Sequence, residues 1–372
     1  MSLLYIQNDI YNRILKNNVM SRTVIASLIA CFLISGIAVS PFFSGKVVGD
    51  AYAQPATRKV LLIANEKPVQ VAPDNALHPG GVMYNAMVFN GTIPGPVVAI
   101  NQGDTLEITL KNDGKTIHSI DFHAGYGPGQ ALSGSVKPGE SKTWTLKGTY
   151  PGAFFYHCGA DGLNGIWEHI ANGMYGGIVV HPTNEQPAKE FYMVMSEIYG
   201  NIPPVFQKPN STGAASFDVA KMLYGSPDLV LTNGESFKYV PAIGEVNKLP
   251  LNANATVFKV KPGELTRWYI VNPGPNDGLA FHFISGILSV RDGTNAANNN
   301  FGMQDRDDET WWIPAGSASV IESTFPTEGL YVGVDHAMKD VVKGGAFAVL
   351  GAANSTATDH PPGTNVPLAP AA

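Results

Sequence analysis

Glycine and proline recur at short intervals along the chain, and this punctuation limits what the chain can fold into. Forty glycines and 27 prolines are spread over 372 residues, mostly in clusters such as NGTIPGP and NPGPNDG. Between the clusters lie short runs rich in β-branched and aromatic residues, such as KVLLIAN, DTLEITLKN and GGIVVHP. Short runs of this kind, separated by turn signals, predict many strands joined by tight turns. We therefore expect an all-β fold.

The strand-like runs fall into two blocks, which predicts two domains. The first block spans residues 57–182 and the second 190–353, and the polar segment TNEQPAKE lies between them. VKPGESKTWTL in the first block is similar to VKPGELTRWYI in the second, which indicates two copies of one β-sandwich in tandem. Residues 354–372 are rich in Pro, Ala, Thr and Asn, a composition typical of a flexible tail.

Residues 1–53 have a different character. Arg22 is followed by the apolar run TVIASLIACFLISGIAVSPFF and then by the small-residue sequence AYAQ. A basic N-terminal region, an apolar core and a cleavage site with small residues predict a secretory signal peptide. The run is also long enough to span a bilayer, so a retained N-terminal anchor is the alternative. Both interpretations predict an exported protein that is periplasmic or extracytoplasmic.

Charge and cysteine content narrow the possible functions. The formal net charge is -6, and no basic stretch is present to neutralise phosphates, which argues against a nucleic-acid partner. Once a signal peptide is removed, Cys158 is the only cysteine left in the chain. It then has no intrachain partner for a disulfide. We expect this thiol either to be buried and inert or to bind a ligand.

The stretch FFYHCGADGLNGIWEHIANGM holds a thiol, two imidazoles and a thioether at short range. One Cys and two His in a plane, with a weakly bound axial Met, form the ligand set of a type 1 (blue) copper site. Cys158, His169 and Met174 supply three of these ligands. His118, in KTIHSIDFHAG, supplies the missing imidazole. A thiol, an imidazole and a thioether at this spacing after a strand favour copper binding over a chance arrangement.

A second site follows if the same two stretches are regular strands, because successive side chains of a strand point to opposite faces. Cys158 and His157 then face opposite sides, and so do His118 and His123. Asp121 falls on the side of His123. We therefore predict a second metal site at His123 and His157 with Asp121 beside it. The peptide bond between Cys158 and His157 would join the two sites.

A catalytic metal needs a third protein ligand and an open position for the substrate. Among the remaining histidines, His336 in GVDHAMKD, directly after the strand-like run LYVGV, is the best placed. We expect His78 and His360 to be solvated, because both lie in Pro- and Gly-rich loops, and His181 to be structural at a strand end. His282 lies in AFHFISGILSV, a run considered below.

These motifs resemble those of the two-domain copper-containing nitrite reductases, which belong to the multicopper oxidase and cupredoxin superfamily. The resemblance covers about residues 59–352. It is carried by FNGTIPGP, HSIDFHAG, FFYHCGADG, WEHIANGMYGGIVV, DDETWWIPAG and YVGVDHAMKD.

The resemblance implies two tandem cupredoxin-like Greek-key β-sandwich domains and a homotrimer. It implies two coppers per chain: a type 1 copper in the first domain, and a type 2 copper held between subunits by His123 and His157 of one chain and His336 of the next. Asp121 matches the family's proton-relaying aspartate. The implied reaction is the one-electron reduction of nitrite to nitric oxide, with the electron passing from type 1 to type 2 copper along Cys158–His157. A small redox protein, a cupredoxin or a cytochrome, is the implied electron donor.

Two features depart from the family pattern. The family carries a second acid–base histidine in its second domain, a few residues after a first one. In AFHFISGILSV, His282 matches the first histidine, and Ile287 stands where the catalytic one is expected. Isoleucine cannot relay a proton, so another group, an altered rate and pH profile, or a different substrate are the alternatives. The loop between Cys158 and His169 is also longer than the family's usual one.

Three other functions compete with nitrite reduction. A laccase-like oxidase with a trinuclear copper cluster needs more histidines than the nine in this chain, and HCGAD stands where His-Cys-His is required. A non-catalytic blue-copper electron carrier needs only the type 1 ligands and leaves His123, His157 and Asp121 unexplained. The third alternative keeps the copper scaffold but acts on another nitrogen oxide or oxidises hydroxylamine, which the Ile287 departure favours.

Overall fold

The computed structural model describes residues 55–125, 134–160, 165–207, 213–243, 249–250, 255–291, 294–295, 300–301 and 305–355. The signal or anchor segment and His360 lie outside the described residues, as does the tail after residue 355. Along the described ranges, no helix has the length and apolar character needed to cross a membrane.

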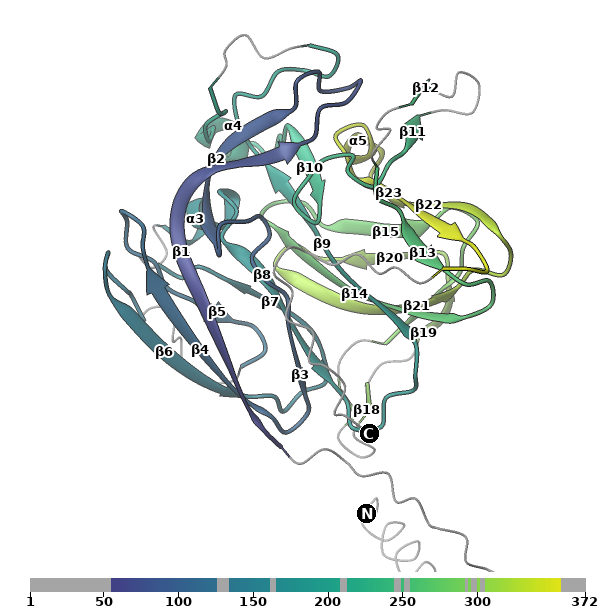
Figure 1. Ribbon diagram of the computed structural model, residues 1–372, viewed down its shortest axis with the longest axis horizontal. Coiled ribbons are helices and arrows are strands. Elements are labelled where there is room, and N and C mark those ends of the chain that lie inside the picture. The colour runs from purple at the N-terminus through teal and green to yellow at the C-terminus, as the bar shows by residue number, and fades with distance from the viewer. Residues whose placement is uncertain are drawn as a thin grey trace, which may run out of the picture. The chain divides into compact units, whose positions relative to one another are not determined.

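The first half of the described chain is built from strands and one short helix, α3 (Ile166–Ala171). The strands are β1 (Thr57–Ala72), β2 (Val82–Phe89), β3 (Val98–Asn101), β4 (Thr105–Asn112), β5 (Asp121–Phe122), β6 (Ser141–Lys147), β7 (Gly152–His157) and β8 (Tyr175–His181). They form two sheets, with the strand orders β2-β1-β4-β6 and β3-β8-β7-β5. In Figure 1, β1, β4 and β6 are coloured purple to blue.

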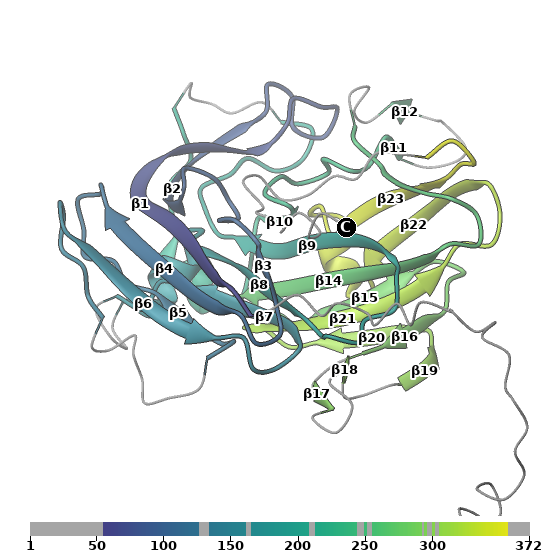
Figure 2. The same cartoon turned by 60° about the horizontal axis from the view of Figure 1, so that its bottom comes forward.

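The second half adds more strands and the short helices α4 (Val219–Leu223) and α5 (Met338–Val341). Its strands are β9 (Lys189–Ile198), β10 (Leu229–Thr232), β11 (Ala242–Ile243), β12 (Leu249–Pro250), β13 (Phe258–Val260), β14 (Leu265–Gly274), β15 (Leu279–Phe283), β16 (Leu288–Val290), β17 (Thr294–Asn295), β18 (Asn300–Phe301), β19 (Asp305–Asp308), β20 (Thr310–Ile313), β21 (Ser317–Thr324), β22 (Gly329–Asp335) and β23 (Ala346–Gly351). The two larger sheets have the orders β10-β9-β14-β21-β16-β19 and β13-β23-β22-β15-β20. Figure 2 shows β9, β14 and β21 of the first of these from a second side.

Alternating burial explains why these segments form sandwiches. Along β4, Leu106, Ile108 and Leu110 are fully buried, while the residues between them are partly exposed. This period of two turns one face of the sheet toward a core. Each half has its own hydrophobic cluster: the first includes Tyr156, and the second is built around Trp268. The expected all-β fold of two tandem cupredoxin-like sandwiches is confirmed.

The two similar VKPGE segments do not occupy equivalent places in their sheets. β4 pairs in parallel with β1 and antiparallel with β6. β14 likewise pairs in parallel with β9 and antiparallel with β21. By position, β14 therefore corresponds to β4, whereas VKPGESKTWTL forms β6, which corresponds to β21. Both halves have the same strand arrangement, as expected, but the two similar sequences lie on strands that are not equivalent. The sequences are alike because the same kind of turn precedes both strands.

Side chains of both halves share a further hydrophobic cluster. It includes Phe155 of β7 and Tyr175 of β8 from the first half, together with Tyr192, Tyr269 and Val320 from the second. The cluster thus extends across strands of both sequence blocks. Apolar burial of this kind opposes relative motion of the two sandwiches.

Candidate metal centres

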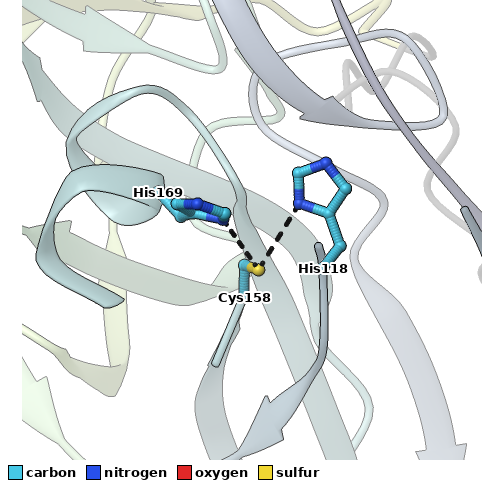
Figure 3. Close-up of side chains that lie close together, drawn as sticks. All are labelled: His118, Cys158 and His169. Carbon is cyan, nitrogen blue, oxygen red and sulfur yellow. Dashed lines mark hydrogen bonds between the residues drawn. The ribbon is translucent and has the colours of Figure 1, made fainter. Parts of the chain in front are cut away.

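The first centre lies at the end of β7, where a thiol and two imidazoles converge. Cys158 Sγ is 3.1 Å from Nδ1 of His169 and 3.7 Å from Nδ1 of His118. Figure 3 shows both rings turned toward the sulfur, with His169 carried on helix α3. All three side chains are buried. Three of the four predicted type 1 ligands therefore meet in the structure.

Backbone hydrogen bonds hold this centre together. The Cys158 amide donates to the carbonyl oxygen of Met174 (3.0 Å), and the Met174 amide donates to the carbonyl oxygen of His169 (3.0 Å). The Ser119 amide donates to Cys158 Sγ at 3.4 Å. Met174 is fully buried in the same hydrophobic cluster as Cys158. Met174, the fourth predicted ligand, is therefore held beside Cys158 and His169 by these backbone hydrogen bonds.

The donor set at this centre fits copper. Thiolate and imidazole together suit copper ions, and burial excludes competing water. Burial raises the pKa of the Cys158 thiol to about 12, so the free thiol keeps its proton at neutral pH. A bound metal cation displaces that proton, because a coordinating thiol is deprotonated outright.

The second centre contains Asp121, His123 and His157, whose donor atoms all lie within 4.8 Å of one another. Nε2 of His123 is 3.3 Å from Nε2 of His157, and Oδ2 of Asp121 is 3.7 Å from the same His157 atom. His157 Nδ1 donates to the carbonyl oxygen of Cys158 at 2.9 Å. This bond places the imidazole proton on Nδ1 and leaves the Nε2 lone pair for a metal. Burial lowers the pKa of His157, which also favours the neutral, metal-binding ring.

His123 is the exposed member of this second centre. Its amide donates to the carbonyl oxygen of Phe155 (3.0 Å). It borders an open hollow of about 400 Å³, lined also by Phe154 and Ser317. The centre is therefore reached from solvent at His123 and, in part, at Asp121, whereas His157 is buried.

The two stretches that carry these ligands are not the regular strands that the sequence argument assumed. β5 contains only Asp121 and Phe122, and His118 pairs with Val136 as an isolated bridge. β7 ends at His157, so Cys158 lies beyond it. The predicted partition of ligands between two sites still appears in the structure. It arises because Asp121 and His157 are directly opposite each other in the β5–β7 pair.

His336 follows β22, is exposed, and is not part of the second centre within this chain. Its ring packs edge-on against His282, with 5.1 Å between ring centroids and 79° between ring planes. His282 Nδ1 donates to the carbonyl oxygen of Glu309 at 2.6 Å and lies 3.2 Å from the Thr310 hydroxyl. Ile287 is 55% exposed and carries no ionisable group.

The sequence argument gave His282 no chemical role, although it stands beside the predicted ligand His336. The contact comes from strand pairing, which the sequence does not specify. His282 lies on β15 opposite Val334 of β22, two residues before His336. Neighbouring strands place such residues on adjoining positions.

The two other histidines in the described part of the chain, His78 and His181, are structural in different ways. His181 ends β8, and its Nδ1 lies 2.7 Å from Oε2 of Glu185. This agrees with the structural role that we expected for it. His78 is buried beside Phe237, with rings 6.2 Å apart. The expected solvation of His78 is wrong, because its loop folds onto the second half.

A two-sandwich fold with a buried Cys-His-His centre defines a copper-binding protein of the cupredoxin type. The family profile described as "Multicopper oxidase" matches residues 70–185. The copper-containing nitrite reductase of Alcaligenes faecalis is 31% identical over 288 residues, which is 72% of this chain and 70% of that protein. A solved structure of the Nitrosomonas europaea copper nitrite reductase matches with a TM-score of 0.65 and 33% identity, covering 80% of this chain and 95% of the other. The chain therefore belongs to the copper-containing nitrite reductase family.

Other relatives are longer than this chain. The copper-containing nitrite reductase of Neisseria meningitidis serogroup A is 32% identical over 277 residues, which is 73% of this chain but only 64% of that protein. The chain thus spans less than two thirds of the length of this relative.

Proposed function

We propose that this protein reduces nitrite to nitric oxide, using one electron and two protons and releasing one water for each nitrite. The observation that carries this proposal is that the consecutive residues His157 and Cys158 belong to different ligand clusters. A buried thiol–imidazole centre is thereby joined by one peptide bond to an open imidazole–carboxylate centre. Support comes from the relatives in Alcaligenes and Neisseria, which are named copper-containing nitrite reductases.

In this proposal each chain binds two coppers. His118, Cys158, His169 and Met174 hold the type 1 copper. Copper, when bound, supplies the one-electron redox chemistry that the reaction needs. The protein separates electron transfer from substrate binding. The first centre is buried, whereas the second borders the open hollow at His123.

The type 2 ligand set is completed by a second copy of the chain, as we propose for a homotrimer. His123 and His157 supply two imidazoles, and His336 of the next copy supplies the third. His336 is exposed, and exposed apolar side chains occur two residues after it, at Met338 (59%), and on the segment that follows β15, at Ile284 (49%). Exposed apolar side chains that gather in one place mark an interaction surface. Because the two faces of such a contact differ, copies join head to tail and close into a ring.

We assign proton transfer to Asp121 and His282. Asp121 is partly exposed, and its carboxylate lies 3.7 Å from the metal-facing nitrogen of His157, so it can pass a proton to a substrate bound there. His282 packs against His336, and the Glu309 carbonyl holds the proton on its Nδ1. In the assembled site His282 would then lie opposite Asp121. This assignment does not require an ionisable group at Ile287.

A small redox protein, either a cupredoxin or a cytochrome, is the proposed electron donor. Helix α3, which carries His169, shares a hydrophobic cluster with α4 through Ala171 and Met222. Trp167 of α3 and Phe217, just before α4, pack against this cluster with their rings 6.4 Å apart. At α4, Leu223 and Tyr224 are 68% and 85% exposed. Apolar side chains next to a buried redox centre suit a transient protein contact. We also propose that the protein is exported, on the strength of its N-terminal sequence.

The test is copper content together with electron paramagnetic resonance of the purified protein, before and after nitrite is added. We expect two coppers per chain and two distinct signals, and only the type 2 signal should change with nitrite. One copper per chain with a type 1 signal alone would contradict the proposal and indicate an electron carrier. Turnover of hydroxylamine that exceeds turnover of nitrite at equal concentration would contradict nitrite as the main substrate.

A further inference from the structure

We propose that Glu66 is a positioning residue for the type 1 copper, which it controls through the His118 ring. Its carboxylate fixes the tautomer of His118 and favours the oxidised over the reduced metal. This inference rests on the proposed function, because it assumes that His118 is a copper ligand.

The first observation is the hydrogen bond across the ring. Oε1 of Glu66, on β1, lies 3.2 Å from Nε2 of His118, although the residues are 52 positions apart in sequence. On the opposite side of the ring, Nδ1 of His118 faces Cys158 Sγ. A carboxylate only accepts hydrogen bonds, so the single proton of a neutral imidazole lies on Nε2. The Nδ1 lone pair is then directed to the sulfur side, where the metal would bind.

The second observation is that the carboxylate is itself held in place. Oε2 of Glu66 accepts from the Lys115 amide at 2.8 Å, and Oε1 accepts from the Thr116 amide at 3.1 Å and the Thr116 hydroxyl at 2.7 Å. Gly114 leaves space for the same group, since a Cβ at that position would lie 2.8 Å from Oε2. The segment before His118 is thus folded around this one carboxylate.

The third observation is the low exposure of the pair. The His118 side chain is 0% exposed and that of Glu66 is 23% exposed. A negative charge separated from the metal by one imidazole is screened less here than at the surface. Hydrogen bonding to a carboxylate also makes a ligating imidazole more basic. Both effects stabilise the higher positive charge of the oxidised metal and lower the reduction potential.

The test compares three variants of the copper-loaded protein. Glu66→Gln removes the charge but keeps an oxygen that can accept from His118. Thr116→Val keeps the charge and removes one hydrogen bond to the carboxylate, together with a hydroxyl that lies 3.3 Å from Nε2 of His118. Glu107→Gln removes a similar charge from a surface pair with Lys59. The measurement is the reduction potential of the type 1 site, read from its thiolate-to-copper absorption band.

We expect Glu66→Gln to shift the oxidised-to-reduced equilibrium toward the reduced form by about tenfold, which is about 59 mV for one electron. Glu107→Gln should leave the potential close to that of the unmodified protein. Thr116→Val, which keeps the charge of Glu66, should shift the potential less than Glu66→Gln does. An unchanged potential in Glu66→Gln, or an equal shift in Thr116→Val, would overturn the inference and leave Glu66 as a loop anchor only. Unmodified protein with no type 1 absorption band would instead overturn the proposed function and, with it, this inference.

A second measurement needs no variant. Long-range proton–nitrogen correlation spectra of the copper-free protein, in which no metal occupies Nδ1, report which ring nitrogen of His118 carries the proton. We expect the proton on Nε2. A proton on Nδ1 would overturn the inference even if Glu66→Gln does not fold.

Discussion

At the scale of single residues, proton transfer at the proposed type 2 site depends on which side chain lies beside His336. The sequence pattern directed attention to Ile287, whereas the ring that packs on His336 is His282. We predict that His282→Gln lowers nitrite turnover by about 10²- to 10⁴-fold, the usual contribution of an acid–base group. Steady-state turnover with an artificial reductant measures this, and copper content confirms that both centres are occupied.

Ile287→Ala is the matched comparison for that experiment. Its side chain is 55% exposed, so the variant should keep the fold and most of the turnover. A large loss of turnover in Ile287→Ala with normal turnover in His282→Gln would show that the assignment of these two positions is reversed.

At the scale of elements, the β7–β8 pair carries the residues that lead into both centres. Tyr156 of β7 lies opposite Gly176 of β8, is fully buried, and donates to the carbonyl oxygen of Pro96 at 2.8 Å. A Cβ on Gly176 would come within 2.5 to 2.6 Å of carbon atoms in the Tyr156 ring. We predict that Gly176→Ala destabilises the protein by about 1–3 kcal/mol through overpacking. Because Tyr156 precedes His157 and Cys158, copper binding should weaken as well.

Chemical denaturation and copper content together measure this effect. Gly213→Ala serves as the control, because no atom lies within 4 Å of a Cβ built there. It should change the free energy of unfolding by no more than about 0.5 kcal/mol. Equal stability of the two alanine variants would contradict the argument that Gly176 is required by the Tyr156 ring.

At the scale of the whole molecule, a buried ionic network joins the two sequence halves. Arg267 on β14 binds Glu185 between the halves (2.9 Å) and Glu322 on β21 (2.7 Å). Glu185 in turn binds His181 at the end of β8. Replacing Arg267 removes one cation from the buried Glu322, which keeps Arg291, and one from the partly buried Glu185, which keeps His181. We predict that Arg267→Met destabilises the protein by about 3–5 kcal/mol.

Thermal or denaturant unfolding of the copper-free protein checks this prediction without the contribution of the metal. Lys59→Met is the comparison, because Lys59 pairs with Glu107 at the surface and its side chain is 76% exposed. A surface pair of this kind contributes about 0–1 kcal/mol. If both variants lost equally little stability, the ionic network would not be what holds the halves together.

The same network should make stability depend on pH. Burial lowers the pKa of His181, but the hydrogen bond and charge of Glu185 outweigh it and raise that pKa above its ordinary value of 6.5. The contribution of His181 is therefore fully present below pH 6.5 and is lost as pH rises through the raised value. Burial raises the pKa of Glu185, but His181 and Arg267 outweigh it and hold that pKa below 4.5, so the contribution of Glu185 is lost only in stronger acid.

The measurement is the difference in unfolding free energy between the unmodified protein and His181→Gln, taken from about pH 5 to about pH 9. We expect the largest difference between pH 4.5 and pH 6.5 and a smaller one at alkaline pH. A difference that grows as pH rises would mean that His181 is not stabilised in its charged form.

The sequence by itself determined the fold class and the first metal centre. Turn residues between short apolar runs encode strands locally, so the all-β fold follows from neighbouring residues alone. Cys158, His169 and Met174 lie within one short segment, and their ligand chemistry is evident without knowing the fold. Membership of the copper-containing nitrite reductase family is likewise visible in the sequence, through identity with its relatives over most of the chain.

Only the tertiary structure decided which distant residues act on those centres. Glu66 reaches His118 from 52 positions away, and His282 meets His336 because β15 pairs with β22. The two similar VKPGE segments lie on strands that are not equivalent, which the sequence also did not reveal. Strand pairing brings together residues that are far apart in the chain, and a local pattern of turns and apolar residues does not specify that pairing or its register.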